Sequence, residues 1–326
     1  MSNPAEFKAK MPVNIALIKY IGKDQEEKNQ ALHATISLRL PRCYTTVTLR
    51  AQPEQRLDTW CMHKDACKLS PQQIERFLDH LRQIKQHYNF AGCFSVYSQC
   101  NFPVAAGLAS SASSFAALTV CAVDAVESIL GIKQQQQLSN LEKAHLSRQG
   151  SGSACRSFFG PWCIWDRDSL QAKSFAEYDQ LVHVALIIST AQKHISTSQA
   201  HELVTTSPLF AKRQDAIKQR YHNFLSALQH KDWGELYNIA WEEFIEMHRL
   251  CHTSKPSFSY CSSVVTKTLE ILKSWWHENG DGPIVTMDAG PNIHLFFRQD
   301  QLYLRKRLLR RLRGIPMLYG TENIVE

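Results

Sequence analysis

The pattern of apolar and polar positions predicts strands near the start of the chain. Residues 13–20 form a mostly apolar run, and residues 44–50 alternate as Tyr-Thr-Thr-Val-Thr-Leu-Arg. Residues 93–98 follow a similar pattern, and residues 158–166 are expected to contain one more strand. Alternation with a period of two is typical of a strand with one buried face.

Longer segments between and after these strands carry apolar residues at helical spacing. Helices are therefore predicted over residues 71–88, 110–130, 136–147, 207–229, 232–252 and 262–279. Residues 148–156 are rich in glycine and serine, and we expect a loop there.

The second half of the chain also contains short apolar runs. Residues 183–189 predict a buried strand that opens a second lobe, and residues 284–287 and 293–297 predict two strands around a turn. A last strand is expected at residues 316–319. Strands and helices in both halves indicate an α+β protein of two lobes with an active-site cleft between them.

Composition narrows the class of protein. The 326 residues suffice for one large domain or two lobes. There is no run of about 18 consecutive apolar residues, so we expect no membrane span. Residues 1–10 lack the apolar core of a signal peptide, so we expect a cytoplasmic protein. The ten cysteines include no C-x-x-C pair, and we expect most of them to be reduced and buried.

A large part of the net charge of +7 lies near the C-terminus. The basic residues there are Arg298, Arg305, Lys306, Arg307, Arg310, Arg311 and Arg313. Such a cluster can bind nucleic acid. Leucines are interleaved with the charges at roughly helical spacing, however, which favours an amphipathic surface helix with a solvated basic face. We therefore expect no nucleic-acid partner.

A glycine- and serine-rich segment over residues 101–118 has the features of an anion site. Gly107 allows close approach of the backbone to a ligand. Ser110 and Ser111 open the helix predicted from residue 110, where unpaired amides and the helix dipole favour a phosphate. The alternative is a capped helix after a polar turn, but one cap needs only one serine, and four are present.

Three other segments carry candidate chemistry. Lys19 and Lys23 follow the apolar run near its end and could bind phosphate; the alternative is a strand end with surface lysines. Arg156, in the small-residue segment 150–157, could bind a carboxylate through two hydrogen bonds; the alternative is a flexible turn. Asp288 places a carboxylate at the sharp turn Asp-Ala-Gly-Pro-Asn, for which ordinary turn formation is the alternative.

Several other kinds of site are not indicated. His248 and His252 are four residues apart, but no glutamate follows His248 in the H-E-x-x-H order and no third ligand is evident, so we expect no zinc. The chain has no Walker A motif, no G-x-G-x-x-G after a strand and no G-x-S-x-G.

Taken in order, four of these segments resemble the mevalonate diphosphate decarboxylases of the GHMP kinase superfamily. The matching segments are residues 12–20, 101–112, 150–157 and 288–292. The resemblance covers most of the chain and implies a two-lobed GHMP-kinase-like fold. It further implies an N-terminal ATP-binding lobe over residues 1–181, ribosomal-protein-S5-like, and a ferredoxin-like substrate lobe over residues 182–326.

The resemblance implies that ATP phosphorylates the tertiary 3-hydroxyl of mevalonate 5-diphosphate. Loss of that phosphate and of carbon dioxide then gives isopentenyl diphosphate. Asp288 would orient or deprotonate the hydroxyl, and Lys19 would keep the carboxylate ionised. Arg156 would bind the substrate carboxylate with the help of Asn14.

Further binding residues are implied in the same way. Those near the substrate diphosphate would be Tyr20, Lys23, Ser153 and Thr197. Those at the nucleotide would be Asn101 beside the adenine and, around the phosphates, Gly107, Ala109, Ser110 and Ser111. Magnesium would be carried by ATP, with Ser110 as the candidate protein ligand. Relatives suggest a homodimer.

The chain also departs from the family pattern. Ile21 replaces a common tryptophan, and His33 and Ala34 replace polar residues. Ser198 stands where some members carry arginine, and His201 replaces a methionine. Fewer cations would then face the 5-phosphate end, so mevalonate 5-phosphate stays open as the substrate. A kinase without decarboxylation stays open too, as does a noncatalytic scaffold that binds nucleic acid.

Overall fold

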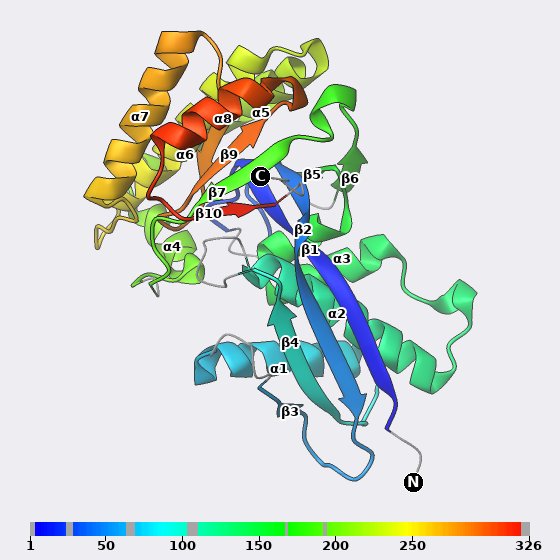
Figure 1. The fold of residues 1–326 in the computed structure, drawn as a ribbon. Helices are drawn as coiled ribbons and strands as arrows, with labels where there is room; N and C mark the ends of the chain where they lie inside the picture. Colours follow the sequence, from blue (N-terminus) through cyan, green and yellow to red (C-terminus); the bar gives the residue numbers. More distant parts are fainter. Residues whose placement is uncertain are drawn as a thin grey trace.

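Two β-sheets, one in each half of the chain, organise the protein (Figure 1). The computed structural model describes residues 4–23, 29–62, 69–102, 110–166, 169–191 and 194–320. The first sheet contains β1 (Glu6–Ile18), β2 (Thr35–Ala51), β3 (Thr59–Trp60), β4 (Phe94–Cys100), β5 (Trp162–Asp166) and β6 (Ser169–Lys173). The second contains β7 (Val182–Leu186), β8 (Ile284–Met287), β9 (Ile293–Phe297) and β10 (Met317–Tyr319).

The strand orders are β3-β4-β2-β5-β6, with β1 paired to β2, and β10-β7-β9-β8. Figure 1 shows α1, α2 and α3 beside the first sheet and α5 to α8 around the second. The helices are α1 (Pro71–His87), α2 (Ser110–Leu130), α3 (Asn140–Gly150), α4 (Thr197–Leu203), α5 (Phe210–His230), α6 (Trp233–Thr253), α7 (Ser263–Asn279) and α8 (Leu302–Arg311). Short 3-10 helices are η1 (Gln134–Gln136), η2 (Gly152–Phe158), η3 (Ala176–Tyr178), η4 (Val204–Thr206) and η5 (Gln299–Gln301).

Strand β1 changes character along its length. Its first half alternates between exposed and more buried positions, whereas every residue from Val13 to Ile18 is buried. The pairing of β1 with β2 shifts register between Pro12 and Val13, where the burial pattern changes. Beyond this point α5 and α6 also pack against β1. The strand therefore leads its last residues, and Lys19 after them, into the interior.

Helix α2 forms the centre of the first half. By length and composition alone it could cross a membrane, and it is the one described helix that meets this test. Its most apolar 18-residue window, however, is 67% buried inside the fold. Its apolar residues pack against β1, β2 and α1, so its hydrophobicity is explained by the core that it fills.

The largest apolar cluster joins the two halves. It includes Trp162 of β5, Phe224 of α5, Leu236 of α6 and Phe296 of β9, all fully buried. Because these side chains come from both sheets and the helices between them, burying them fixes the two halves against each other. A site built from both halves therefore has a rigid support.

The structure confirms the predicted α+β class and most of the predicted elements. The helix at residues 110–130 and the strands at 284–287 and 293–297 have the expected bounds. The loop predicted at residues 148–156 is wrong, because α3 continues to Gly150 and η2 follows. Buried Ala154 and Cys155 pack this segment into the core. The division of the chain after residue 181 falls just before β7 and stays a prediction.

Truncating a residue of the joining cluster is expected to destabilise the whole protein. Leu236→Ala should lower the free energy of unfolding by about 2–5 kcal/mol, because it leaves a cavity among buried side chains. Urea unfolding monitored by circular dichroism measures this loss. Leu57 is 76% exposed, so Leu57→Ala is the matched control and should change stability by less than about 0.5 kcal/mol. Equal effects of the two variants would contradict the proposed role of the cluster.

Candidate active site

The ends of two strands from different sheets meet at an ion pair. Lys19 follows β1, and Asp288 follows β8. The Lys19 Nζ donates to Asp288 Oδ1 at 2.6 Å and to the carbonyl of Ala16 at 2.6 Å. The Lys19 side chain is 2% exposed and that of Asp288 is 23% exposed. The carboxylate is thus held from inside the protein and remains reachable from outside.

The surroundings of Asp288 keep it ionised. Burial by itself would raise the pKa of Asp288, but the nearby Lys19, His294 and Arg156 hold that pKa below its ordinary value. Burial lowers the pKa of Lys19, while Asp288 and Glu243 oppose this effect. An ionised carboxylate with a fixed orientation can accept a hydrogen bond, and then a proton, from a hydroxyl placed against it.

Arg156 occupies a second buried position beside this pair. It lies in η2, and its Nε donates to Asn14 Oδ1 at 3.1 Å. Asn14 is oriented in turn, because its Nδ2 donates to Ser157 Oγ at 2.9 Å and to the carbonyl of Ser153 at 3.2 Å. The Arg156 Nη1 also donates to Thr35 Oγ1 at 3.4 Å. The guanidinium is therefore fixed in place, as binding of a small carboxylate requires.

Tyr20 packs closely against the segment that carries Arg156. Its hydroxyl donates to the carbonyl of Asn29 at 3.0 Å, so the hydroxyl hydrogen is used within the protein. We therefore expect Tyr20 to support the site from beside the place that the resemblance implies for the substrate diphosphate. A Cβ atom at Gly152 would lie 2.4 Å from the Tyr20 hydroxyl oxygen, so only glycine fits at residue 152.

His201 of α4 completes this side of the site. Its ring centroid lies 4.5 Å from that of Tyr20. Burial, aided by the charge of Lys23, lowers the pKa of His201 to about 3, so the imidazole is neutral near pH 7. Thr197 is exposed at the start of α4, and Lys23 is half-buried. In the sequence His201 stands out only as a departure from the family pattern, and its contact with Tyr20 arises from the tertiary fold.

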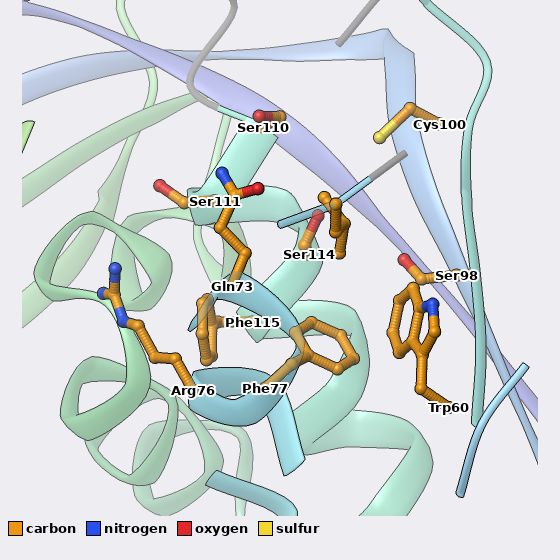
Figure 2. Close-up of a pocket in the computed structure, with 11 residues that line it drawn as sticks. Trp60, Gln73, Arg76, Phe77, Ser98, Cys100, Ser110, Ser111, Ser114 and Phe115 are labelled. Atoms are coloured by element: carbon orange, nitrogen blue, oxygen red, sulfur yellow. The ribbon is translucent and has the colours of Figure 1, made fainter. Parts of the chain in front are cut away.

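A pocket at the start of α2 lies apart from the ion pair (Figure 2). Ser110 and Ser111 line it together with Ser114 and Phe115 of the same helix. The remaining lining residues are Trp60, Leu69, Gln73, Arg76, Phe77, Ser98 and Cys100. Figure 2 shows aromatic rings in its lower part and serine hydroxyls above them. Such a lining suits a flat, apolar base and a phosphate group.

The other predicted nucleotide-binding residues are placed differently. Gly107 and Ala109 lie outside the residues that the structure describes. The Asn101 side chain donates to the carbonyl of Arg42 at 2.6 Å and accepts from the amide of Tyr44 at 2.8 Å. Asn101, which follows β4, thus contacts the main chain of β2 near its middle, and it is not among the described residues that line the pocket. Trp60 and Phe77 were missed because no local motif marks them.

His248 is a further residue to which the sequence alone assigns no role. It is buried on α6, and its Nδ1 lies 3.7 Å from Cys261 Sγ. Burial, followed by the charge of Lys19, lowers the pKa of His248 to about 4. A neutral imidazole therefore lies beside the ion pair. Across the described ranges, no group of three or more His, Cys, Asp or Glu side chains is arranged to hold a metal ion.

Comparisons with known proteins identify the family of the chain. Residues 11–176 match the profile of the diphosphomevalonate decarboxylase-like N-terminal domain. Residues 183–316 match that of the mevalonate 5-diphosphate decarboxylase C-terminal domain. The diphosphomevalonate decarboxylase of Saccharomyces cerevisiae is 29% identical over 88% of this chain and 76% of its own length.

Solved structures are similar over nearly the whole chain. The mevalonate diphosphate decarboxylase of Legionella pneumophila is 39% identical, with a TM-score of 0.91, over 96% of this chain and 100% of that one. The protein MDDEF in complex with MVAPP, AMPPCP and magnesium is 27% identical. Its TM-score is 0.85, and the match covers 97% of each chain.

The buried His201 is expected to make stability depend on pH. The unfolded chain binds a proton at this histidine near pH 6.5, whereas the folded protein binds it only near pH 3. Folding stability attributable to His201 is therefore lost as pH falls through this window, by up to about 1.4 kcal/mol per pH unit. Urea unfolding of His201→Met between pH 7 and 4 should show a shallower loss than the wild type. Equal slopes would contradict the buried, neutral state.

Proposed function

Because the chain belongs to the mevalonate 5-diphosphate decarboxylase family, we propose that it decarboxylates mevalonate 5-diphosphate at the expense of ATP. The products are isopentenyl diphosphate, ADP, phosphate and carbon dioxide. One observation carries the proposal: Asp288, paired with Lys19 at 2.6 Å, stands beside the fixed guanidinium of Arg156. A carboxylate that can activate a hydroxyl and a cation that can bind a carboxylate are the two groups that this substrate needs.

Asp288 has the central role in the proposed chemistry. A tertiary alcohol is a weak nucleophile, and an ionised carboxylate against its hydrogen orients the oxygen and accepts the proton. Lys19 holds the carboxylate in one orientation from its buried side. ATP supplies the phosphoryl group that turns the 3-oxygen into a leaving group. When phosphate departs, the electrons of the bond to the carboxylate carbon form the alkene, and carbon dioxide is released.

Arg156 has a positioning role toward the substrate carboxylate. Its contacts with Asn14 and Thr35 leave the guanidinium little freedom, so a bound carboxylate is held with the breaking carbon–carbon bond in a defined direction. Holding a reactant in one orientation lowers the entropic part of the activation free energy, because the orientation is fixed before the reaction starts. Asn14 contributes by fixing the arginine, which is consistent with the help that the resemblance implies for it.

The pocket at the start of α2 is the proposed nucleotide site. The amides of the first turn and the hydroxyls of Ser110 and Ser111 suit phosphate oxygens, and the aromatic side chains suit the adenine. Magnesium is proposed to be bound through the phosphates, with Ser110 as the candidate protein ligand. The related protein MDDEF was solved with AMPPCP and magnesium, which supports both cofactors.

Mevalonate 5-phosphate is the second candidate substrate, and one observation favours it. His201 is neutral, and Ser198 stands where some relatives carry an arginine. The charge of Lys23 acts on His201, so Lys23 is one cation near this side of the described site. The cytoplasmic location and the homodimer predicted from the sequence stay predictions.

Asp288→Asn is expected to bind substrate normally and to lower kcat by about 10²–10⁴-fold, because the amide cannot accept the hydroxyl proton. Steady-state release of ADP and carbon dioxide measures this effect. Asp281→Asn is the matched control, since Asp281 lies before the same strand and forms a half-buried pair with Arg298 away from the Lys19 pair. A kcat of Asp288→Asn within twofold of the wild type would contradict the base assignment.

Turnover on the two substrates tests the proposed reaction itself. With ATP and magnesium present, we expect kcat/KM for mevalonate 5-diphosphate to exceed that for the 5-phosphate by about tenfold or more, because the second phosphate adds an anionic contact. The reverse ratio would identify the monophosphate as the substrate. Release of ADP without carbon dioxide on both would identify a kinase instead.

A further inference from the structure

A buried carboxylate contacts the main chain of the active-site lysine. Glu243, on α6, is 0% exposed. Its Oε1 accepts a hydrogen bond from the backbone amide of Lys19 at 3.1 Å. Lys19 is the first residue after β1, so its amide has left the ladder that fixes the strand. Glu243 supplies the partner that the sheet no longer provides.

Two arginines hold Glu243 in this position. Arg213, also 0% exposed, donates to Glu243 Oε1, and Arg220 Nη1 donates to Glu243 Oε2 at 2.6 Å. Glu246 pairs with the same two arginines but is 22% exposed. Burial by itself would raise the pKa of Glu243, but the arginines hold that pKa below its ordinary value. The four side chains form a charge-balanced network between α5 and α6.

Helix α6 is placed so that it can set both partners of the ion pair. It packs against β8, which ends one residue before Asp288, and against β1, which ends one residue before Lys19. Glu243 gives this packing a specific hydrogen bond to the main chain of Lys19. Buried charged networks add little net stability, since desolvation offsets their attraction. The presence of this network at this place therefore calls for an explanation other than stability.

We propose that Glu243 is a positioning residue, which fixes the main chain of Lys19 so that its ammonium reaches Asp288. This role rests on the proposed function, because it acts through the carboxylate that activates the hydroxyl. Glu243 contacts the Lys19 amide and acts through Lys19. A shift of the lysine main chain would move the carboxylate away from the orientation that proton transfer requires.

The charge of Glu243 also favours the protonated lysine. Four groups face Lys19 from the elements around it: Asp288 and Glu243 raise its pKa, Arg156 lowers it, and the neutral His248 lies close by. Loss of the Glu243 charge therefore lowers the pKa of Lys19. Because Lys19 must be protonated to hold Asp288, the high-pH limb of the kcat profile should move to lower pH.

Glu243→Gln is the first test, and Glu246→Gln is its matched control. Both variants remove one carboxylate from the same arginine pair, but only Glu243 contacts Lys19. We expect Glu243→Gln to lower kcat about tenfold, as loss of a charged hydrogen-bond partner would. The high-pH limb of the kcat profile of this variant should move to lower pH, while KM for ATP stays unchanged. Glu246→Gln should keep kcat within twofold and leave the limb in place.

If Glu243→Gln does not fold, a double variant provides a second test. Glu243→Met with Arg213→Met replaces the buried pair by apolar side chains of similar size and leaves Arg220 with Glu246. Residue-resolved hydrogen exchange then reports on the Lys19 amide without any substrate. We expect this amide to exchange about tenfold or more faster in the double variant than in the wild type.

The outcomes separate this proposal from the proposed function. Unchanged exchange at Lys19 in the double variant would overturn the positioning role, whatever the enzyme does with substrate. Equal losses of kcat and melting temperature in Glu243→Gln and Glu246→Gln, without a shift of the limb, would show a structural role only. An inactive wild type with faster Lys19 exchange in the double variant would overturn the assigned reaction and leave the anchoring of Lys19 intact.

Discussion

The site depends on the compensation of a buried ammonium group. A charge inside a protein is tolerated only when partners nearby replace the water that it has lost. Lys19, 2% exposed, meets this condition through the Asp288 carboxylate and the Ala16 carbonyl. Asp288 directly follows β8 of the other sheet. One electrostatic requirement therefore brings the two halves of the chain to the same point, and the joining apolar cluster keeps them there.

Much of this arrangement could be predicted from the sequence, because short local patterns mark the elements involved. Residues 284–287 and 293–297 are short apolar runs around a turn signal, so their strands and the position of Asp288 follow directly. The helix at 110–130 is marked by a dense run of small and apolar residues. Lys19, Asp288 and Arg156 could be selected because charged side chains beside glycine or at a sharp turn stand out from a plain scaffold.

The rest depends on contacts between segments far apart in the sequence. Glu243 reaches Lys19 across 224 positions, and nothing in the sequence around Glu243 distinguishes it from a surface glutamate of an amphipathic helix. Trp60 lines the nucleotide pocket from a two-residue strand, which is too short to show a period. The hydrogen bond from the Tyr20 hydroxyl to the Asn29 carbonyl could not be predicted for the same reason, because the fold brings the two residues together.

The tight contact at Gly152 restricts how this protein can change. Tyr20 contacts the backbone at Gly152, and its hydroxyl donates to the carbonyl of Asn29. The Asn29 side chain in turn donates to the carbonyls of Arg148 and Gln149 at the end of α3. Even a methyl group at position 152 would displace a chain of contacts that runs through Tyr20 and Asn29 to the end of α3. Attempts to broaden substrate range by mutagenesis are therefore better directed at the exposed start of α4, where the backbone has room to accept new side chains.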